Sequence, residues 1–175
     1  MMGVTGAGEA LVIIAYDGSP AARHAVVDAA KIVGSCRILV TTVWEEGLAY
    51  AGPSVPGPDT MMISTPVDPE TALRLDRSFH EHAERVSNEG AALARSLGLD
   101  AEPLALPDEG SVARTILRLA RERHAAAIVV GSRGLSGFRA KLEGSTSKGL
   151  LKHAPCPVVV VHEADEQHDE VQDNA

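Results

Sequence analysis

Short apolar runs alternate along this chain with segments whose apolar residues recur at helical spacing, and this alternation restricts the fold more than any other feature. The short runs predict strands at residues 11–16, 36–43, 100–106, 126–130 and 157–162. The helical spacing predicts helices at residues 20–33, 69–97, 111–124 and 145–153. Strands that alternate with helices form a parallel sheet covered on both faces. We therefore predict one α/β domain, a doubly wound sheet of five parallel strands in the order 3-2-1-4-5, with helices on both faces.

The predicted helices carry recognisable start and stop signals. Ser19-Pro20 and Asp68-Pro69 each place a capping side chain before a proline that suits the first helical position. Gly34 is a candidate stop for the first helix. The long second helix is expected to bury one face, which is made of Leu75, Phe79, Ala83, Val86, Gly90, Leu93 and Leu97.

The chain consists of one domain, two terminal segments of different composition and one long connection within the domain. We expect a flexible segment at residues 1–10, a single folded domain at 11–162 and a disordered acidic tail at 163–175. The tail holds six of the 24 acids and no base, so the rest carries 18 acids against 16 bases. Residues 47–67 are rich in Gly and Pro and predict a long irregular connection, either a functional cover or a mobile segment.

Composition and charge exclude several classes of function. The net charge of −8 and the lack of a basic stripe argue against nucleic acid or an anionic membrane as the main partner. No apolar run approaches the roughly 20 residues that span a bilayer, and the first residues lack a basic signal-peptide region. Cys36 and Cys156 are too far apart in sequence to indicate a redox motif. We therefore expect a soluble cytoplasmic protein without a membrane or nucleic-acid partner.

The glycine-rich segment at residues 130–145 is the strongest candidate for chemistry. Gly131, Gly134 and Gly137 follow the fourth strand, and Gly144-Ser145 opens the last helix. Bare main-chain N–H groups in such turns can form an anion nest, and a helix N-terminus suits a phosphate. The competing interpretation is a flexible loop with ordinary glycines and a serine cap. The segment is neither a P-loop nor a Rossmann fingerprint, because G-K-[ST] is absent and Gly6-Ala7-Gly8 precedes the first strand.

A second candidate lies at the ends of the first two strands. Asp17 could bind sugar hydroxyls, a base amino group or a metal, or it could only turn the chain and charge a helix start. In the predicted strand order, strands 1 and 4 are neighbours whose crossovers lead to opposite faces, which opens a crevice at their carboxyl ends. Asp17 and Gly131 would line that crevice from its two sides. Val43 would form an apolar wall for a base.

These segments together resemble the universal stress protein family over residues 10–162. The resemblance is carried by IIAYDGSP at 13–20, TTVWE at 41–45, AIVVGSRGLSGF at 127–138 and GSTSKGLLKHAPCPVVVVH at 144–162. The ATP-binding subgroup of the family has the pattern G-x2-G-x9-G-[ST], matched here by Gly131, Gly134, Gly144 and Ser145. One departure is Ala126, where the family usually has an acid.

The resemblance implies binding of ATP, or of AMP or ADP, with Mg²⁺ or Mn²⁺ as a possible companion. Asp17 and Val43 would hold the adenosine. The phosphates would be held by Gly131, Ser132, Arg133, Gly134, Gly144, Ser145 and Thr146. The resemblance also implies a homodimer, formed through the last strand at residues 157–162. The charges of Arg133, Arg139 and Lys141 could pair with phosphates or be solvated, and Arg133 is the favoured one because it adjoins the nest.

Two functions fit the same residues. The first is a nucleotide-dependent regulatory protein of the stress response, and the second is a slow ATP hydrolase. We favour binding, because the sequence offers no base to activate water except Asp17 acting through a metal. Micromolar affinity for ATP is expected. Gly131→Val or Gly144→Val is expected to abolish binding without unfolding the chain.

Overall fold

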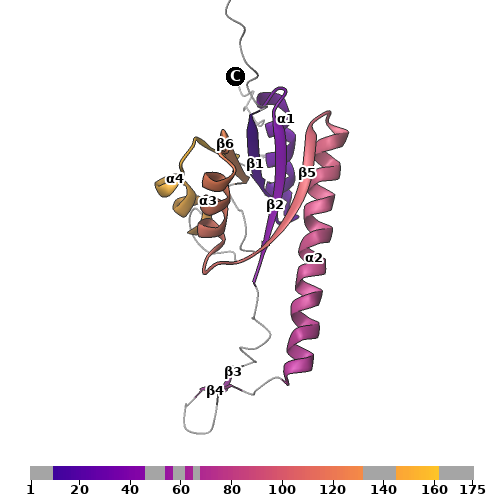
Figure 1. Cartoon of the computed structure of the whole chain (residues 1–175), viewed down its shortest axis with the longest axis vertical. Coiled ribbons are helices and arrows are strands. Elements are labelled where there is room, and N and C mark those ends of the chain that lie inside the picture. Colours follow the sequence, from indigo (N-terminus) through magenta and orange to yellow (C-terminus); the bar gives the residue numbers. More distant parts are fainter. Residues whose placement is uncertain (1–9, 46–53, 57–61, 65–67, 132–144, 162–175) are drawn as a thin grey trace, which may run out of the picture.

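The core of the computed structural model is a five-stranded, all-parallel sheet (Figure 1). The structure describes residues 10–45, 54–56, 62–64, 68–131 and 145–161. The sheet has the order β5-β2-β1-β6-β7. Its strands are β5 (Asp100–Pro107), β2 (Arg37–Trp44), β1 (Leu11–Ala15), β6 (Ala127–Gly131) and β7 (Val158–Val161). In chain order this is 3-2-1-4-5, so the predicted topology is confirmed.

Helices cover both faces of the sheet, as predicted. Helices α1 (Pro20–Ile32) and α2 (Pro69–Ser96) pack on one face, and α3 (Val112–Glu122) and α4 (Ser145–His153) pack on the other. Figure 1 shows the sheet between these two helix pairs. Because each helix runs back from the end of one strand to the start of the next, the helix N-termini gather at the carboxyl edge of the sheet.

The side chains of β1 show how the sheet divides the core into two clusters. Val12 and Ile14 join the cluster under α1 and α2, whereas Ile13 and Ala15 join the cluster under α3 and α4. Successive side chains of a strand point to opposite faces, so a strand covered on both faces is apolar throughout. This is why residues 11–16 lack the alternation of a half-exposed strand.

The helix signals in the sequence fall where the helices begin and end. The Ser19 hydroxyl accepts a hydrogen bond from the Ala22 N–H at 3.1 Å and caps α1. Asp68 caps α2 in the same way, and Ser111 caps α3. Gly34 follows the end of α1 with a φ of +57°, a conformation that favours glycine. These caps fix where each helix leaves the edge of the sheet.

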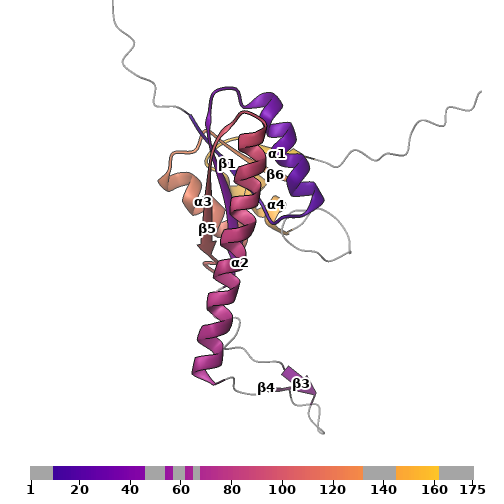
Figure 2. The same ribbon diagram turned by 90° about the vertical axis from the view of Figure 1, so that its right-hand side faces the viewer.

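Helix α2 differs from its prediction in the face that it buries. It has 28 residues and is roughly 42 Å long, whereas the eight-residue β5 beneath it spans only about 26 Å. Its N-terminal part therefore projects past the strands (Figure 2). The predicted core residues Leu75, Phe79 and Leu97 are 39%, 37% and 41% exposed. The rest of the predicted face is confirmed: Ala83 and Gly90 are buried with their neighbours Ser87, Ala91 and Ala94, and Val86 and Leu93 pack against the core.

The connection between β2 and α2 also corrects the prediction of an irregular segment. It contains two short antiparallel strands, β3 (Ser54–Pro56) and β4 (Met62–Ser64), with Val55 opposite Ile63. Paired strands were unexpected because Gly and Pro dominate this part of the sequence. The expected flexible start and acidic tail lie outside the described residues, apart from Ala10.

Candidate functional site

The turn that follows β1 is held in one conformation by hydrogen bonds within it. One carboxylate oxygen of Asp17 accepts a hydrogen bond from the Ser19 N–H at 3.0 Å. Gly18 has a φ of +78°, in the region that other residues rarely adopt. Together with the Ser19 cap, these features direct the chain from the buried strand into α1. The Asp17 carboxylate is therefore fixed at the carboxyl edge of the sheet.

The end of β2 is tied to the same turn. The Tyr16 N–H donates to the Thr41 carbonyl at 2.9 Å, and the Thr42 hydroxyl donates to the Tyr16 carbonyl at 2.8 Å. Thr42 is buried, so its hydroxyl must find such a partner. These bonds extend the pairing of β1 and β2 by a residue and bring Asp17 beside the last residues of β2.

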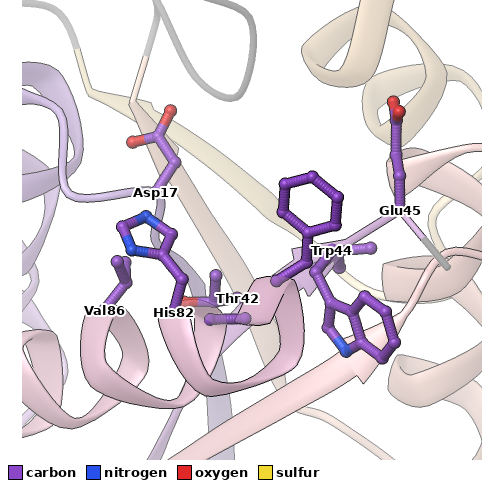
Figure 3. Close-up of a pocket in the computed structure, with 9 residues that line it drawn as sticks. Asp17, Thr42, Trp44, Glu45, His82 and Val86 are labelled. Atoms are coloured by element: carbon purple, nitrogen blue, oxygen red, sulfur yellow. The ribbon is translucent and has the colours of Figure 1, made fainter. Parts of the chain in front are cut away.

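A cleft opens where these two strand ends meet α2 (Figure 3). Its volume is about 280 Å³. It is lined by residues from three elements: Asp17 after β1, Thr42, Val43, Trp44 and Glu45 at the end of β2, and Phe79, His82, Ala83 and Val86 on α2. Two residues predicted from the sequence, Asp17 and Val43, thus line one cavity. Val43 also packs against the cluster under α3.

The contribution of α2 was missed by sequence reasoning. Phe79, Ala83 and Val86 were assigned to the buried face of the helix, and all three also line the cleft. Their spacing, with His82 between them, is the spacing of one helical face. The sequence offered two signals. One was a histidine on an otherwise apolar helix face, and the other was the single tryptophan of the chain at the end of a strand, Trp44-Glu45. Periodicity alone cannot separate a core face from a cavity wall.

The polar groups of the cleft are acids and a histidine. Asp17 and Glu45 are its carboxylates, and the His82 ring lies beside the Asp17 side chain in Figure 3. The Nδ1 atom of His82 is 3.5 Å from a guanidinium nitrogen of Arg85 on the next turn of α2. The cleft can accept hydrogen bonds from hydroxyl or amino groups and is poorly suited to an anion.

Trp44 is held against α2 on the other side of the cleft. Its ring and the His80 ring have centroids 5.4 Å apart and are tilted by 56°. The Nε2 atom of His80 lies 3.3 Å from a carboxylate oxygen of Glu84, one turn further along the helix. The Trp44 carbonyl accepts from the Asp108 N–H at 2.7 Å, which joins the end of β2 to the loop after β5.

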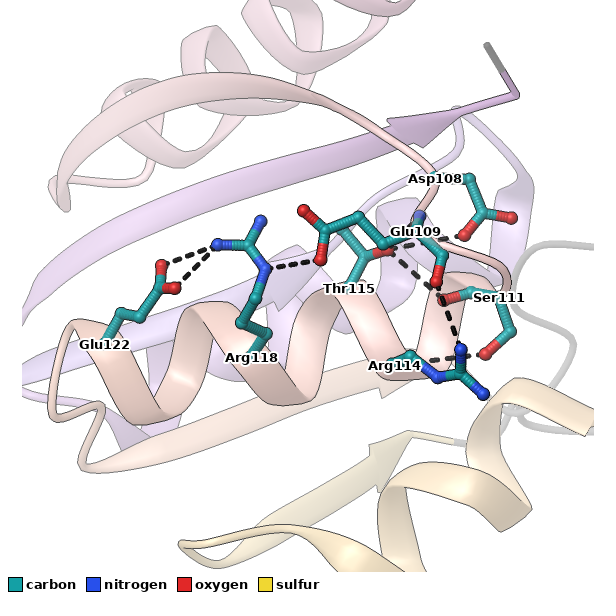
Figure 4. Close-up of polar contacts among 7 residues, drawn as sticks. All are labelled: Asp108, Glu109, Ser111, Arg114, Thr115, Arg118 and Glu122. Atoms are coloured by element: carbon teal, nitrogen blue, oxygen red, sulfur yellow. Dashed lines mark hydrogen bonds and ion pairs between the residues drawn. The ribbon is translucent and has the colours of Figure 1, made fainter. Parts of the chain in front are cut away.

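That loop, between β5 and α3, is a fixed border of the site (Figure 4). The buried Thr115 hydroxyl accepts from the Glu109 N–H at 2.9 Å and lies 3.3 Å from a carboxylate oxygen of Asp108. The Arg118 guanidinium joins Glu109 and Glu122, with nitrogen–oxygen distances of 2.6 and 2.7 Å. These bonds hold Asp108 in place, so the Trp44 main chain is anchored at the rim of the cleft.

Tyr16 lies under the junction of α1 and α2. Its side chain is fully buried, and burial raises the pKa of its phenol, with Arg23 opposing and Glu89 reinforcing this shift. Arg23 of α1 forms an ion pair with Glu89 of α2 above it. The pair therefore joins the two helices that cover this face of the sheet, close to the turn that carries Asp17.

Gly131 meets α1 rather than an open space. A Cβ atom added there would lie 2.7 Å from the carbonyl oxygen of Ala21, closer than real Cβ contacts allow. The strand register brings Val130 opposite Ala15, so the end of β6 does lie beside the Asp17 turn, as predicted. Gly131→Val is therefore expected to destabilise the fold as well as to affect binding, because the added bulk would collide with main chain.

The remaining predicted phosphate ligands are only partly covered by the structure. Helix α4 begins at Ser145, as predicted, and Thr146 is buried. Ser132, Arg133, Gly134 and Gly144 lie outside the described residues, and so do Arg139 and Lys141. Of the last strand, Val158–Val161 is described and forms the edge strand β7.

The described residues contain neither a cluster of metal ligands nor a membrane-spanning helix. Within this part of the chain, no three histidine, cysteine, aspartate or glutamate side chains gather in a way that could hold a metal ion. None of the helices in the described segments combines the length and apolarity needed for a bilayer span.

Comparison with known proteins defines the class to which this fold and this cleft belong. The model of the universal stress protein family matches residues 11–162. A universal stress protein of Thermus aquaticus is 34% identical over 152 residues, which are 86% of this chain and 96% of that protein. The chain belongs to the universal stress protein family. It spans about half the length of a relative from Mycobacterium tuberculosis, to which it is 29% identical over 155 residues.

Solved structures show the same fold at lower identity. A universal stress protein from Lactobacillus plantarum has a TM-score of 0.65 at 19% identity, covering 89% of this chain and 99% of that one. A family member from Arabidopsis thaliana has AMP bound, with a TM-score of 0.56, 20% identity, and 92% and 97% coverage. One from Archaeoglobus fulgidus is in complex with dAMP, with a TM-score of 0.56, 20% identity, and 88% and 98% coverage.

Proposed function

We propose that this chain is a nucleotide-binding regulatory protein whose cleft at Asp17 and Val43 holds the nucleoside of ATP. The observation that carries the proposal is the cleft itself, which lies at the ends of β1 and β2, beside the switch point between β1 and β6. Doubly wound folds bind their ligands outside this carboxyl edge of the sheet. Its volume of about 280 Å³ is at the small end of ligand pockets and suits a nucleoside better than a whole triphosphate.

The charges of the site favour a nucleoside inside the cleft and phosphates outside it. Asp17 and Glu45 would repel phosphates but can accept hydrogen bonds from ribose hydroxyls or a base amino group. The start of α4 at Ser145 offers unpaired N–H groups and a positive dipole end at the same edge of the sheet. We therefore assign the phosphates to Ser145, Thr146 and the glycine segment that begins at Gly131, with Ser132, Arg133, Gly134 and Gly144.

The identity of the nucleotide rests on the sequence motif and on related structures. The family members with AMP and dAMP support an adenine nucleotide. The glycine pattern from Gly131 to Ser145 is what favours ATP over a monophosphate. Mg²⁺ or Mn²⁺ would be held by phosphate oxygens, water and the Asp17 carboxylate, an arrangement that Mg²⁺ commonly adopts.

Two further parts of the proposal concern assembly and location. Among the described residues, strand β7 pairs with β6 alone, and an apolar strand at the edge of a sheet invites association. We propose a homodimer through this edge, and light scattering is expected to give twice the chain mass of 18.3 kDa. We assign to the dimer the role of a cytoplasmic regulator whose partner depends on the bound nucleotide.

Calorimetric titration with ATP tests the proposal. Affinity in the micromolar range is expected, and neither heat nor thermal stabilisation at millimolar ATP would overturn it. Asp17→Asn keeps an acceptor for the Ser19 N–H but removes the charge, so affinity should fall roughly 10-fold or more. Asp28→Asn on the exposed face of α1 removes a carboxylate paired with Lys31 and should leave affinity unchanged. Phosphate release from the same preparation separates binding from slow hydrolysis.

A further inference from the structure

Helix α2 gives the cleft an aromatic wall that neither the glycine motif nor Asp17 supplies. Phe79 lines the cleft and is nevertheless 37% exposed. Large apolar side chains at a cavity mouth are frequently binding groups, because their burial is completed by a ligand. Phe79 is also one of only three ring-bearing cleft residues, with Trp44 and His82. A flat ring entering the cleft would therefore meet aromatic carbon as well as carboxylate.

The wall is held in position by the packing of α2. Ala83 and Val86, on the same helical face as Phe79, seat the helix beside the sheet, and Ala83 is buried. His82 is placed next to Asp17 and is in contact with Arg85. On the far side, the His80 ring packs on Trp44 and joins the helix to the end of β2. Phe79 thus projects from a part of α2 that is fixed to the two strands that form the cleft.

We propose that Phe79 is a base-binding residue that stacks on the base of the bound nucleotide, with His82 closing the edge of the base beside Asp17. This inference rests on the proposed function, since it assigns the base of that ligand to the α2 side of the cleft. Base stacking on an aromatic ring is tolerant of base identity. The contact is made with the base and not with the phosphates, so its contribution is the same for adenosine, AMP and ATP.

Truncation of Phe79 measures this contribution. In Phe79→Ala, affinity for adenosine, AMP and ATP should fall by one common factor, roughly 5- to 100-fold. Phe79→Tyr should retain wild-type affinity, whereas Phe79→Leu should not, because an aliphatic side chain keeps the apolar surface but lacks a ring to stack. Binding is followed by calorimetry and by the fluorescence of Trp44, the one tryptophan of the chain.

The matched control is Leu75→Ala, one turn earlier on the same helix. Leu75 is 39% exposed, close to the value for Phe79, but it does not line the cleft. Its truncation should leave all three affinities unchanged. Phe79→Ala with wild-type affinities, Phe79→Leu with wild-type affinities, or a loss confined to ATP would each overturn the inference. If the wild-type protein binds none of the three ligands, the proposed function has failed instead.

Discussion

The two ends of α2 have the same kind of apolar spacing but meet different surroundings. Toward its C-terminus the helix lies on the sheet, and the residues in contact are small, such as Gly90, Ala91 and Ala94. Toward its N-terminus the helix projects past the strands, and Leu73 and Leu75 are exposed. At the packed end, the main chain of the helix lies close to the sheet, so only small residues fit between them. The cleft lies between these two ends, where Phe79, His82, Ala83 and Val86 of α2 face the end of β2.

A second tight contact, between β6 and α1, gives the largest expected effect on stability. Gly131→Val should destabilise the chain by about 3 kcal/mol, because its Cβ would collide with the Ala21 main chain, which cannot move as a side chain does. Urea unfolding measures the loss. Ala126→Val, at an exposed position just before the same strand, should change stability by less than about 0.5 kcal/mol. Equal stability of the two variants would show that the contact at Gly131 is loose.

Gly90→Ala tests the packed end of α2 directly. The added Cβ would lie 2.7 Å from the Tyr16 ring and 2.8 Å from Val40. Alanine improves helix propensity by about 1 kcal/mol, so steric conflict must overcome that gain. A net loss of about 1–2 kcal/mol is expected in urea unfolding. The exposed Asn88→Ala on the same helix gains propensity without conflict, so a stabilised Gly90→Ala would contradict the tight packing.

The sequence was sufficient for the topology and for the helix starts. Strands β1 and β6 are buried on both faces, which local apolarity reveals, and Ser19, Asp68 and Ser111 cap helices by local chemistry. These features depend on neighbours in the chain, so a pattern can predict them. The strand order then followed from the alternation of elements and from the family resemblance.

The cleft was predictable only in part. Asp17 and Val43 end neighbouring strands, and that placement follows from topology. Phe79 and His82 reach the cleft because α2 is longer than the sheet, which helical periodicity cannot reveal. The role of Gly131 was likewise hidden, since the same bare backbone suits a phosphate and a close helix. The distance to Ala21 shows that packing against α1 requires a glycine at this position.

The projecting end of α2 should tolerate loss of its apolar side chains. Leu73→Ser with Leu75→Ser is expected to change the free energy of unfolding by less than about 0.5 kcal/mol, because both residues are exposed in the folded state. Leu93→Ser, at a half-buried position of the packed end, should cost about 1–2 kcal/mol. Chemical denaturation of both variants gives the comparison. A double variant as unstable as Leu93→Ser would mean that the projecting end is covered in solution.

The smallest expected effect is a pH dependence at the start of the projecting end. Hydrogen bonds from Thr71, and then from the Glu70 N–H, lower the pKa of the exposed Asp68 carboxyl that caps α2. A lowered pKa in the folded state means that this stabilisation is complete above the unfolded value of about 3.9 and is lost as the pH falls through the folded value.

Asp68→Asn keeps a capping oxygen without the charge, so the wild type should be slightly more stable than the variant at pH 7. This difference should shrink as the pH falls below the unfolded value of about 3.9, and it should disappear below the lowered folded pKa, where both side chains are neutral. Urea midpoints of the two proteins across that range provide the measurement, and acid effects elsewhere in the chain cancel in the difference. A gap that persists unchanged at acid pH would mean that the charge of Asp68 plays no part in starting the helix.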